Sequence, residues 1–244
     1  MALERTAKNL NVNLLHIPLE TKEHNKWKSD LTGQSVSVEN AILDLFKIKN
    51  WNGYAGEGGL ILNLIKAMSF PLISKRHRSC FIEAIYAKNV SFKEDLFETE
   101  WLLNNIDKST EIQVRKNFNI MSSKEPYTIN FGSFTSTQDT SMLDYFPDLK
   151  ENLFVELFNA LGNKKIREIA EIFSENPYEY RKGWPDVTLW KDKNVYFLEV
   201  KAPGDRLQKS QKTIINKFMK PLNLNFALVN VSASPKTTNT IKNK

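Results

Sequence analysis

The chain has 244 residues, of which 41% are hydrophobic and 11% aromatic, and its net charge is +6. This composition supports a core for one domain or slightly more, argues against disorder over most of the chain, and favours anionic partners. The single cysteine, Cys80, excludes an internal disulfide and a zinc site built from cysteines. No apolar run approaches about eighteen residues, the length of a membrane span, so we expect neither a signal peptide nor a membrane segment and predict a cytoplasmic location, nucleoid-associated or nuclear in a eukaryote.

Apolar residues recur at helical spacing through most of the region between residues 20 and 175. Gly162 is expected to end the last of these helices. Segment 122–141 is polar and rich in turn-forming residues, so we predict a long loop there. The predicted helices cover residues 37–49, 60–68, 77–89, 92–105 and 148–162.

After residue 183 the hydrophobic period becomes that of strands. Residues 186–190 and 195–200 are predicted strands joined by a charged turn, 207–220 a helix and 225–231 a further strand. The predicted fold class is therefore α/β or α+β, a small mixed sheet with packed helices preceded by a helical N-terminal region. We divide the chain into a helical region (1–175), a sheet-containing core (176–232) and a flexible basic tail (233–244).

Two acids and a lysine are expected to converge on this sheet. Glu199 and Lys201 are two residues apart on one strand and share a face, and the hairpin brings Asp186 alongside. With the carbonyl of Val200, these carboxylates form an all-oxygen ligand set that suits Mg²⁺ or Mn²⁺, and Lys201 would lie beside the attacking water or the phosphate. Alternatively, Asp186 caps a strand and Glu199 and Lys201 form a solvated ion pair that contributes about 0–1 kcal/mol.

The same residues carry a resemblance to a known superfamily. "PDV" followed thirteen residues later by "EVK" is similar to the PD-(D/E)XK nuclease core, and "EVKAPGDRLQKSQ" resembles its VRR-NUC branch. The resemblance implies a deoxyribonuclease that depends on Mg²⁺ or Mn²⁺ and hydrolyses phosphodiester bonds with a metal-activated water. It also implies that Gln211 orients this water or the lysine. Ala202 departs from the glycine that usually follows the lysine in this family.

A second resemblance lies upstream, in "WNGYAGEGGLILNLIKAMSF". It is similar to a segment of the Fanconi-associated nuclease family, which implies that Glu57 completes the metal site with Asp186 and Glu199. The alternative for Glu57 is an acid that only stabilises a helix N-terminus. Glu156 is a second candidate for the remote ligand, because simpler PD-(D/E)XK enzymes take this glutamate from a helix nearer the core.

The predicted partner is DNA, and the resemblance to the Fanconi-associated nuclease family implies branched or 5′-flap DNA. A monomer is favoured. Two basic groups could contact its phosphates, or could simply be solvated. Trp184 is expected in the core, with base stacking as the alternative. Two other functions stay open: a dimeric Holliday-junction resolvase and a catalytically inactive DNA-binding module. The proposed phosphate contacts are Arg206, Lys209, Lys212 and Lys217 in one group and Lys75, Arg76 and Arg78 in the other.

Overall fold

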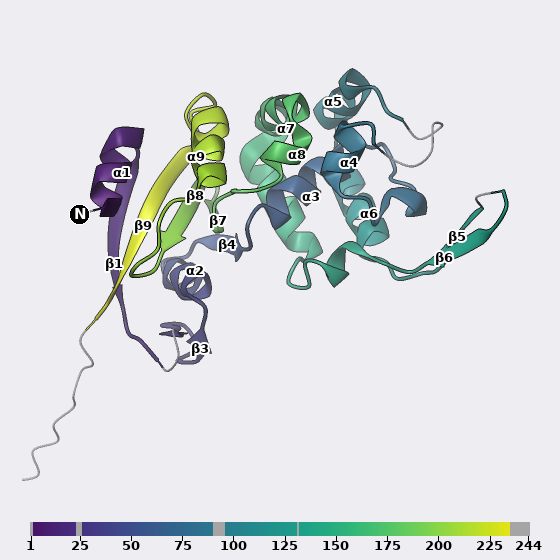
Figure 1. Ribbon diagram of the computed structural model, residues 1–244. Helices are drawn as coiled ribbons and strands as arrows, with labels where there is room; N and C mark the ends of the chain where they lie inside the picture. Colours follow the sequence, from purple (N-terminus) through teal and green to yellow (C-terminus); the bar gives the residue numbers. More distant parts are fainter. Residues whose placement is uncertain (1, 23–25, 90–95, 131, 235–244) are drawn as a thin grey trace, which may run out of the picture.

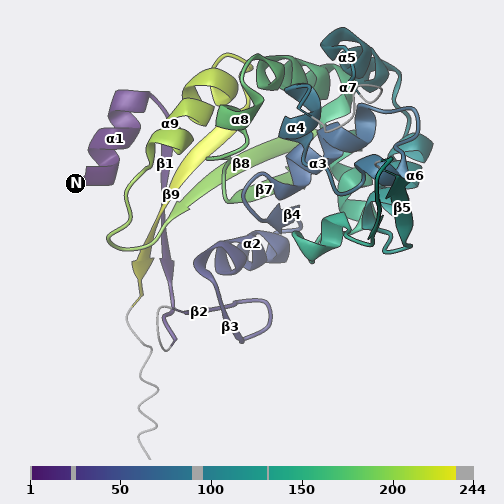
Figure 2. The same cartoon turned by 45° about the vertical axis from the view of Figure 1, so that its right-hand side comes forward.

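The computed structural model describes residues 2–22, 26–89, 96–130 and 132–234. It consists of a twisted sheet with helices on both faces and, beside it, a helical body from which a β-hairpin projects (Figure 1 and Figure 2). Among the helices of these residues, none combines the length and the apolar character needed to cross a membrane. Most of the predicted tail, residues 235–244, lies outside the described residues.

Five strands form one mixed sheet, namely β1 (Asn13–Leu19), β4 (Asn52–Ala55), β7 (Val187–Lys191), β8 (Asn194–Lys201) and β9 (Asn225–Ala233). Their order is β1-β9-β8-β7-β4. β1 and β8 run parallel to β9, whereas β7 is antiparallel to both β8 and β4. The prediction of a mixed sheet is confirmed.

Both faces of the sheet are covered, because side chains of alternate residues on the central strands are apolar on each face. α2 (Val38–Ile48) packs on one face, where it meets Leu198 and Val200 of β8. α9 (Lys209–Ile214), which continues into a π-helical turn (Ile215–Met219), belongs to the core on the other face, the side of Phe197. The predicted strand-strand-helix-strand order of residues 186–231 is confirmed.

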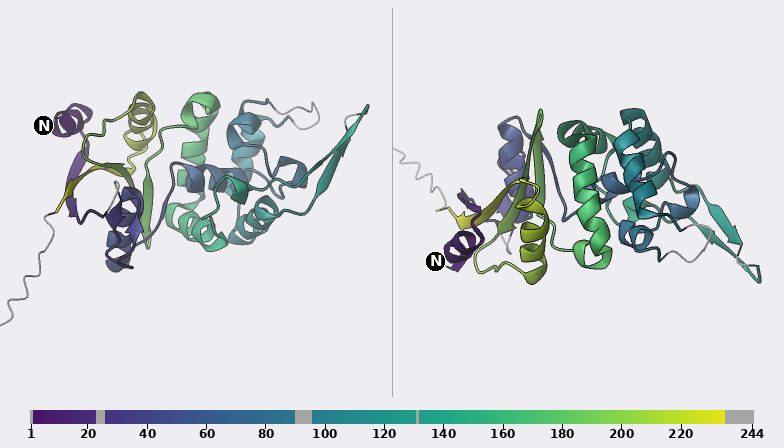
Figure 3. Two further views of the ribbon diagram at one scale, coloured as in Figure 1. Left: turned by 60° about the horizontal axis from the view of Figure 1, so that its bottom comes forward. Right: turned by 90° about the horizontal axis from the view of Figure 1, so that it is seen from above.

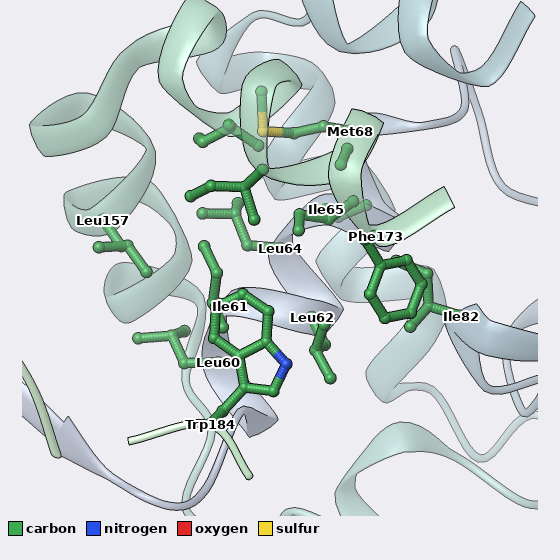
Figure 4. Close-up of a cluster of buried hydrophobic side chains, with 14 of the residues drawn as sticks. Leu60, Ile61, Leu62, Leu64, Ile65, Met68, Ile82, Leu157, Phe173 and Trp184 are labelled. Atoms are coloured by element: carbon green, nitrogen blue, oxygen red, sulfur yellow. The ribbon is translucent and has the colours of Figure 1, made fainter. Parts of the chain in front are cut away.

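The helical body is built around α3 (Gly59–Met68), which is apolar and buried almost all round. Figure 4 shows its side chains packed against those of α7 (Glu151–Glu175), with Trp184 reaching into the same cluster. The other helices of the body are α4 (Ile82–Tyr86), α5 (Thr99–Lys108), α6 (Glu111–Ser122) and α8 (Pro177–Tyr180).

The helix end predicted at Gly162 is confirmed, and a second helix follows directly after it, so that α7 consists of two helices joined at a kink. Gly162 has φ 75° and ψ 160°, a backbone conformation that is accessible almost only to glycine. Helical structure resumes directly after it and continues to Glu175. The glycine therefore places a kink between two helical halves of α7.

Two expectations about the N-terminal region are corrected. Segment 122–141 is not an unstructured loop, because its Thr, Ile and Tyr residues form the hairpin of β5 (Tyr127–Asn130) and β6 (Thr135–Gln138). Residues before 175 are also not purely helical, because β1 and β4 pair with strands far away in the sequence. This region further contains α1 (Ala2–Leu10), β2 (Trp27–Lys28) and β3 (Ser35–Val36).

Candidate active site

Asp186, Glu199 and Lys201 lie together at one end of the sheet, on the α9 side. Val187 pairs with Leu198 in the antiparallel register of β7 and β8. Asp186, the residue before Val187, therefore lies opposite Glu199, the residue after Leu198. The Asp186 Oδ2 accepts a hydrogen bond of 2.8 Å from the backbone N–H of Val200. The predicted alternation is correct, because Leu198 and Val200 face α2 while Glu199 and Lys201 face the other side.

Glu199 and Lys201 form a buried ion pair rather than a solvated one. Glu199 is 1% exposed and Lys201 7% exposed. The Lys201 Nζ lies 2.6 Å from the Glu199 Oε1, which also accepts a 2.5 Å hydrogen bond from the Gln211 side-chain amide. The carbonyl of this amide accepts the backbone N–H of Gln208, which fixes Gln211 at the start of α9. The alternative of a surface pair at this position is therefore excluded.

The surroundings of both carboxylates disfavour their ionisation. Burial raises the pKa of Glu199, and the adjacent charge of Asp186 raises it further, to about 9, although Lys201 acts in the opposite direction. Burial also raises the pKa of Asp186, against the hydrogen bond from Val200 and the charge of Lys201. Two acids and one lysine leave an uncompensated negative charge when both acids are ionised, which is an environment that favours a cation.

Glu57 lies at the same edge of the sheet although it is remote in the sequence. β4 pairs with β7, and the pairing continues past the strand end through a 2.9 Å hydrogen bond from the Gly56 N–H to the Asp186 carbonyl. The next residue, Glu57, is exposed, and its Oε1 accepts a 2.6 Å hydrogen bond from the Gly183 N–H. The upstream acid is thus adjacent to the segment that carries Asp186.

Gly183 is a positioning residue that the sequence analysis did not identify. Its φ is +82°, and a Cβ at this position would lie 2.4 Å from the backbone carbonyl carbon of Ser210 and 2.6 Å from the N of Gln211. Only glycine therefore allows the start of α9 to approach this closely. The signal in the sequence was the glycine of "GWPD" directly before Asp186.

The oxygen atoms gathered here fit a hard divalent cation. Asp186 and Glu199 offer carboxylates, and the carbonyl of Val200 points to the same strand edge as its N–H, toward Asp186. Such an oxygen set suits Mg²⁺ or Mn²⁺ better than zinc. In the part of the chain that the structure describes, no three His, Cys, Asp or Glu side chains group as a metal site. Glu57 instead bonds to Gly183, so its role as third ligand stays a prediction.

Glu156 is held at a different place along the sheet. Its Oε2 accepts a 3.0 Å hydrogen bond from the Trp190 Nε1, and its Oε1 accepts one of 3.1 Å from Asn152. Trp190 is four residues along β7 from Asp186, which corresponds to about 13 Å in a strand. The geometry therefore favours Glu57 over Glu156 as the remote ligand.

Trp184 lies in the core, which was the preferred expectation. It is 1% exposed, its Nε1 donates to the Tyr180 carbonyl at 2.7 Å, and its ring centroid lies 4.9 Å from that of Phe218. It also contacts the Gly58 backbone, where an added Cβ would lie 3.1 Å from the tryptophan. Trp184 thus packs the turn after Glu57 against the π-helical turn that follows α9 and is too buried to stack on a base.

The basic residues near the site remain available to a ligand. All four members of the first predicted group are exposed, and none forms an ion pair with another described residue. The sequence analysis missed Lys182, which is exposed and lines a pocket of about 220 Å³ together with Glu57. Arg181 lines it too, paired at 2.9 Å with Glu83. The four predicted phosphate contacts are Arg206, Lys209, Lys212 and Lys217.

The second basic group is partly corrected. Arg78 is 1% exposed, and its guanidinium donates to the backbone carbonyls of Glu125, Gln138 and Thr140, so the predicted phosphate contact by Arg78 is wrong. Lys75 is exposed and pairs with Glu125 at 2.5 Å. A phosphate contact by Lys75 or Arg76 stays a prediction.

Known proteins resemble this chain in sequence over a short stretch and in fold over nearly its whole length. A Fanconi-associated nuclease 1 homolog from Caenorhabditis briggsae is 36% identical over 66 residues, which is 26% of this chain and 8% of that protein. The homolog from Caenorhabditis elegans is 38% identical over 60 residues, 24% of this chain and 7% of that protein. The chain therefore aligns with less than a tenth of either relative.

Two crystal structures of paFAN1 share the fold. The structure with 2-nt 5′-flap DNA and a gap matches with a TM-score of 0.61 and 19% identity, covering 96% of this chain and 42% of paFAN1. The structure with 1-nt 5′-flap DNA matches with a TM-score of 0.62 and 16% identity, with the same coverage. The mixed α and β architecture of the chain is therefore that of a known nuclease structure.

The family model described as the VRR-NUC domain matches residues 136–233, a range that starts ahead of the predicted boundary at residue 176. It contains α7, the three central strands and α9, and with them Asp186, Glu199, Lys201 and Gln211. Residues 136–233, which are less than half of the chain, are therefore similar to the VRR-NUC domain.

Proposed function

We propose that the chain is a metal-dependent, structure-specific DNA nuclease that hydrolyses phosphodiester bonds. The observation that carries this proposal is the cluster of Asp186, Glu199 and Lys201, in which Glu199 and Lys201 are buried and Asp186 is half-buried. Placing two acids where the pKa of each is raised, chiefly by burial, is unfavourable in itself, and strongly shifted carboxylates gather at functional sites more often than elsewhere. The VRR-NUC domain match over the same residues supports the assignment.

Asp186 and Glu199 would hold the cation, with the Val200 carbonyl and Glu57 as further oxygen ligands. Bound Mg²⁺ or Mn²⁺ would polarise a phosphate oxygen and lower the pKa of a water molecule. Lys201, fixed by its 2.6 Å contact with Glu199, is placed to stabilise negative charge that develops on the phosphate. Gln211 holds the Glu199 carboxylate in one orientation and leaves its other oxygen for a ligand.

Branched or 5′-flap DNA is the proposed substrate class. The two paFAN1 structures that share the fold are described as bound to 5′-flap DNA. The exposed cations Arg206, Lys209 and Lys212 lie 5 to 11 residues after Lys201, before and within α9. Lys182 adds positive charge on the Glu57 side. Together they provide the contacts that attract a phosphate backbone to the site.

Cleavage of labelled single-stranded, nicked, 5′-flap and four-way DNA with Mg²⁺, Mn²⁺ or EDTA tests this proposal. Asp186→Asn and Glu199→Gln keep side-chain volume and remove a charge, and each should lower the cleavage rate at least about 100-fold, a loss of about 3 kcal/mol of transition-state stabilisation. Asp192→Asn, in the exposed β7–β8 turn, is the matched control and should cleave like the wild type.

Three results would contradict the proposal in different ways. Undiminished cleavage by Asp186→Asn would reject the metal site. Paired symmetric nicks in four-way junctions by a dimeric protein, with poor flap cleavage, would establish a resolvase instead. DNA binding without cleavage of any substrate in either metal would leave a DNA-binding module.

A further inference from the structure

The β5–β6 hairpin extends away from the helical body as a two-stranded ribbon (Figure 1). Its strands, Tyr127–Asn130 and Thr135–Gln138, pair only with each other among the described residues. Both views of Figure 3 show it leaving the body toward the side of the molecule where α9 lies, whereas α2 lies on the opposite side. The ribbon therefore projects on the side that carries the predicted active site.

The composition of the hairpin differs from that of the rest of the surface. Residues 127–138 contain no charged residue, although 25% of the chain is charged. None of the described residues in this range is buried, and the exposed ones include Thr128, Asn130, Thr135 and Thr137. Exposed ribbons usually carry lysines or prolines that prevent edge pairing. The ribbon has no such residue. It carries hydroxyl and amide side chains interspersed with Tyr127, Ile129 and the exposed Phe134, a composition that indicates a binding element.

The hairpin is anchored firmly at its base. The buried Arg78 guanidinium donates to the Glu125, Gln138 and Thr140 carbonyls on both arms of the ribbon, and it lies 4.9 Å from the Tyr127 ring centroid. Arg78 thus explains the basic segment that the sequence suggested for phosphate binding: it fixes the direction in which the hairpin projects.

We propose that the β5–β6 hairpin is an arm that lies in a groove of duplex DNA away from the scission site, an inference that rests on the proposed nuclease function. A two-stranded ribbon fits the major groove of B-DNA, and Thr, Ser, Asn and Gln side chains can bond to base edges and phosphates. No acid on the ribbon repels the phosphates. Tyr127, Ile129 and Phe134 also lie on the ribbon, and Phe134 is 60% exposed, so a contact with a protein is the competing outcome of the test.

The experiment measures DNA binding in EDTA by fluorescence anisotropy, with flap duplexes that differ only in duplex length. In one variant, residues 129–136 are replaced by Asn-Gly, which can close a two-residue turn between the paired Thr128 and Thr137. Four-residue strands span about 13 Å. At 3.4 Å per base pair, this length corresponds to about 4 bp. As the duplex is lengthened to reach the hairpin, the DNA affinity of the wild type should therefore rise once more over about 4 added base pairs. The truncated protein should lack this step and bind long duplexes about fivefold more weakly.

Two further measurements separate a DNA contact from loss of fold. Because the hairpin carries no cation, truncation should leave the slope of log affinity against log salt unchanged. Thr135→Lys and Thr135→Glu place opposite charges at one exposed position, so the first should tighten long-duplex binding and raise the salt slope by about 1, and the second should weaken binding. Thermal unfolding should show that all three variants stay folded.

Each failure has a distinct reading. If the wild type neither binds nor cleaves DNA, the proposed nuclease function itself fails. If the wild type binds and cleaves flap DNA but truncation leaves its affinity for long duplexes unchanged, only the hairpin proposal is overturned. Loss of self-association on truncation, without any change in DNA affinity, would likewise overturn it and identify the ribbon as a contact between proteins.

Discussion

Replacing Gly183 with alanine is the sharpest test of how the site is assembled. Gly183 joins two parts of it, because its N–H donates to Glu57 and its bare Cα lies against the backbone at Ser210 and Gln211. A methyl group would meet the Ser210 carbonyl carbon at 2.4 Å. Contacts below 3.0 Å essentially do not occur, so α9 or the Gly183 loop has to move by about 0.6 Å, which is 3.0 minus 2.4.

The magnitude follows from two contributions. A non-glycine residue in the left-handed region costs about 1–2 kcal/mol, and overpacking against backbone adds about 1–3 kcal/mol. We therefore expect Gly183→Ala to lower the free energy of unfolding by about 2–5 kcal/mol. Catalysis should fall by about 10- to 100-fold in kcat, because Gln211 on the displaced helix orients Glu199 and a displacement near 1 Å can cost about 100-fold.

Gly204→Ala is the matched control. Gly204 has a φ of +95°, so alanine there meets similar backbone strain, but nothing lies within 4 Å of the added methyl. Urea unfolding and single-turnover cleavage of a flap substrate should show a small stability loss and near-normal kcat for this control. Equal stability and equal rates for Gly183→Ala and Gly204→Ala would refute the argument that close packing at Gly183 positions the site.

Three further predictions concern single side chains. Glu57→Gln keeps the oxygen that accepts the Gly183 N–H, but its cleavage rate should fall at least about 100-fold. Glu156→Gln should stay active in the same assay. The opposite ranking of the two variants would make Glu156 the remote metal ligand. The pKa of Glu199 in the folded protein is about 9, above its ordinary value of 4.5. Its contribution to the free energy of unfolding is therefore fully present below about pH 4.5 and is lost as the pH rises through 9. In EDTA, Glu199→Gln should thus lose less stability than the wild type between pH 6 and pH 9, and an equal pH dependence of both proteins in urea unfolding would contradict this. Arg78→Met should lower the free energy of unfolding by about 2–4 kcal/mol, because it leaves backbone carbonyls without a donor. Lys75→Met breaks only an exposed ion pair and should change this free energy by less than about 1 kcal/mol. Equal effects of the two variants in thermal unfolding would show that Arg78 does not anchor the hairpin.

The part of the site that could be predicted from sequence depends on local geometry. The two-residue period of a strand places Glu199 and Lys201 on one face, and a short hairpin brings Asp186 opposite Glu199. Both relations follow from residues within one hairpin, so no knowledge of the remaining fold was needed. The burial of the Glu199–Lys201 pair could not be predicted in the same way, because it depends on α9 and Gln211 covering that face.

Relations that depend on distant contacts escaped prediction. Arg78 looked like a surface cation because Lys75 and Arg76 precede it. Its partners at Glu125, Gln138 and Thr140, however, lie at the base of a hairpin 47 to 62 residues later. β4 is too short to give a clear alternation, and it is a strand only because β7 pairs with it. Long-range pairing overrides weak local preference in both cases.

The position of Glu57 has a consequence for how the site responds to substrate. The helical body lies in the sequence between Gly56, after β4, and Asp186, before β7. Because β4 and β7 are neighbours in the sheet, the chain leaves the sheet and returns to it at the same place. Glu57 and Gly183 stand at these two crossings and are joined by their 2.6 Å hydrogen bond. The distance between the Glu57 and Asp186 carboxylates is therefore set by how the helical body sits on the sheet. DNA that contacts both parts at once would act on this distance directly. If Glu57 is the third metal ligand, as proposed, substrate binding can therefore control the completion of the metal site.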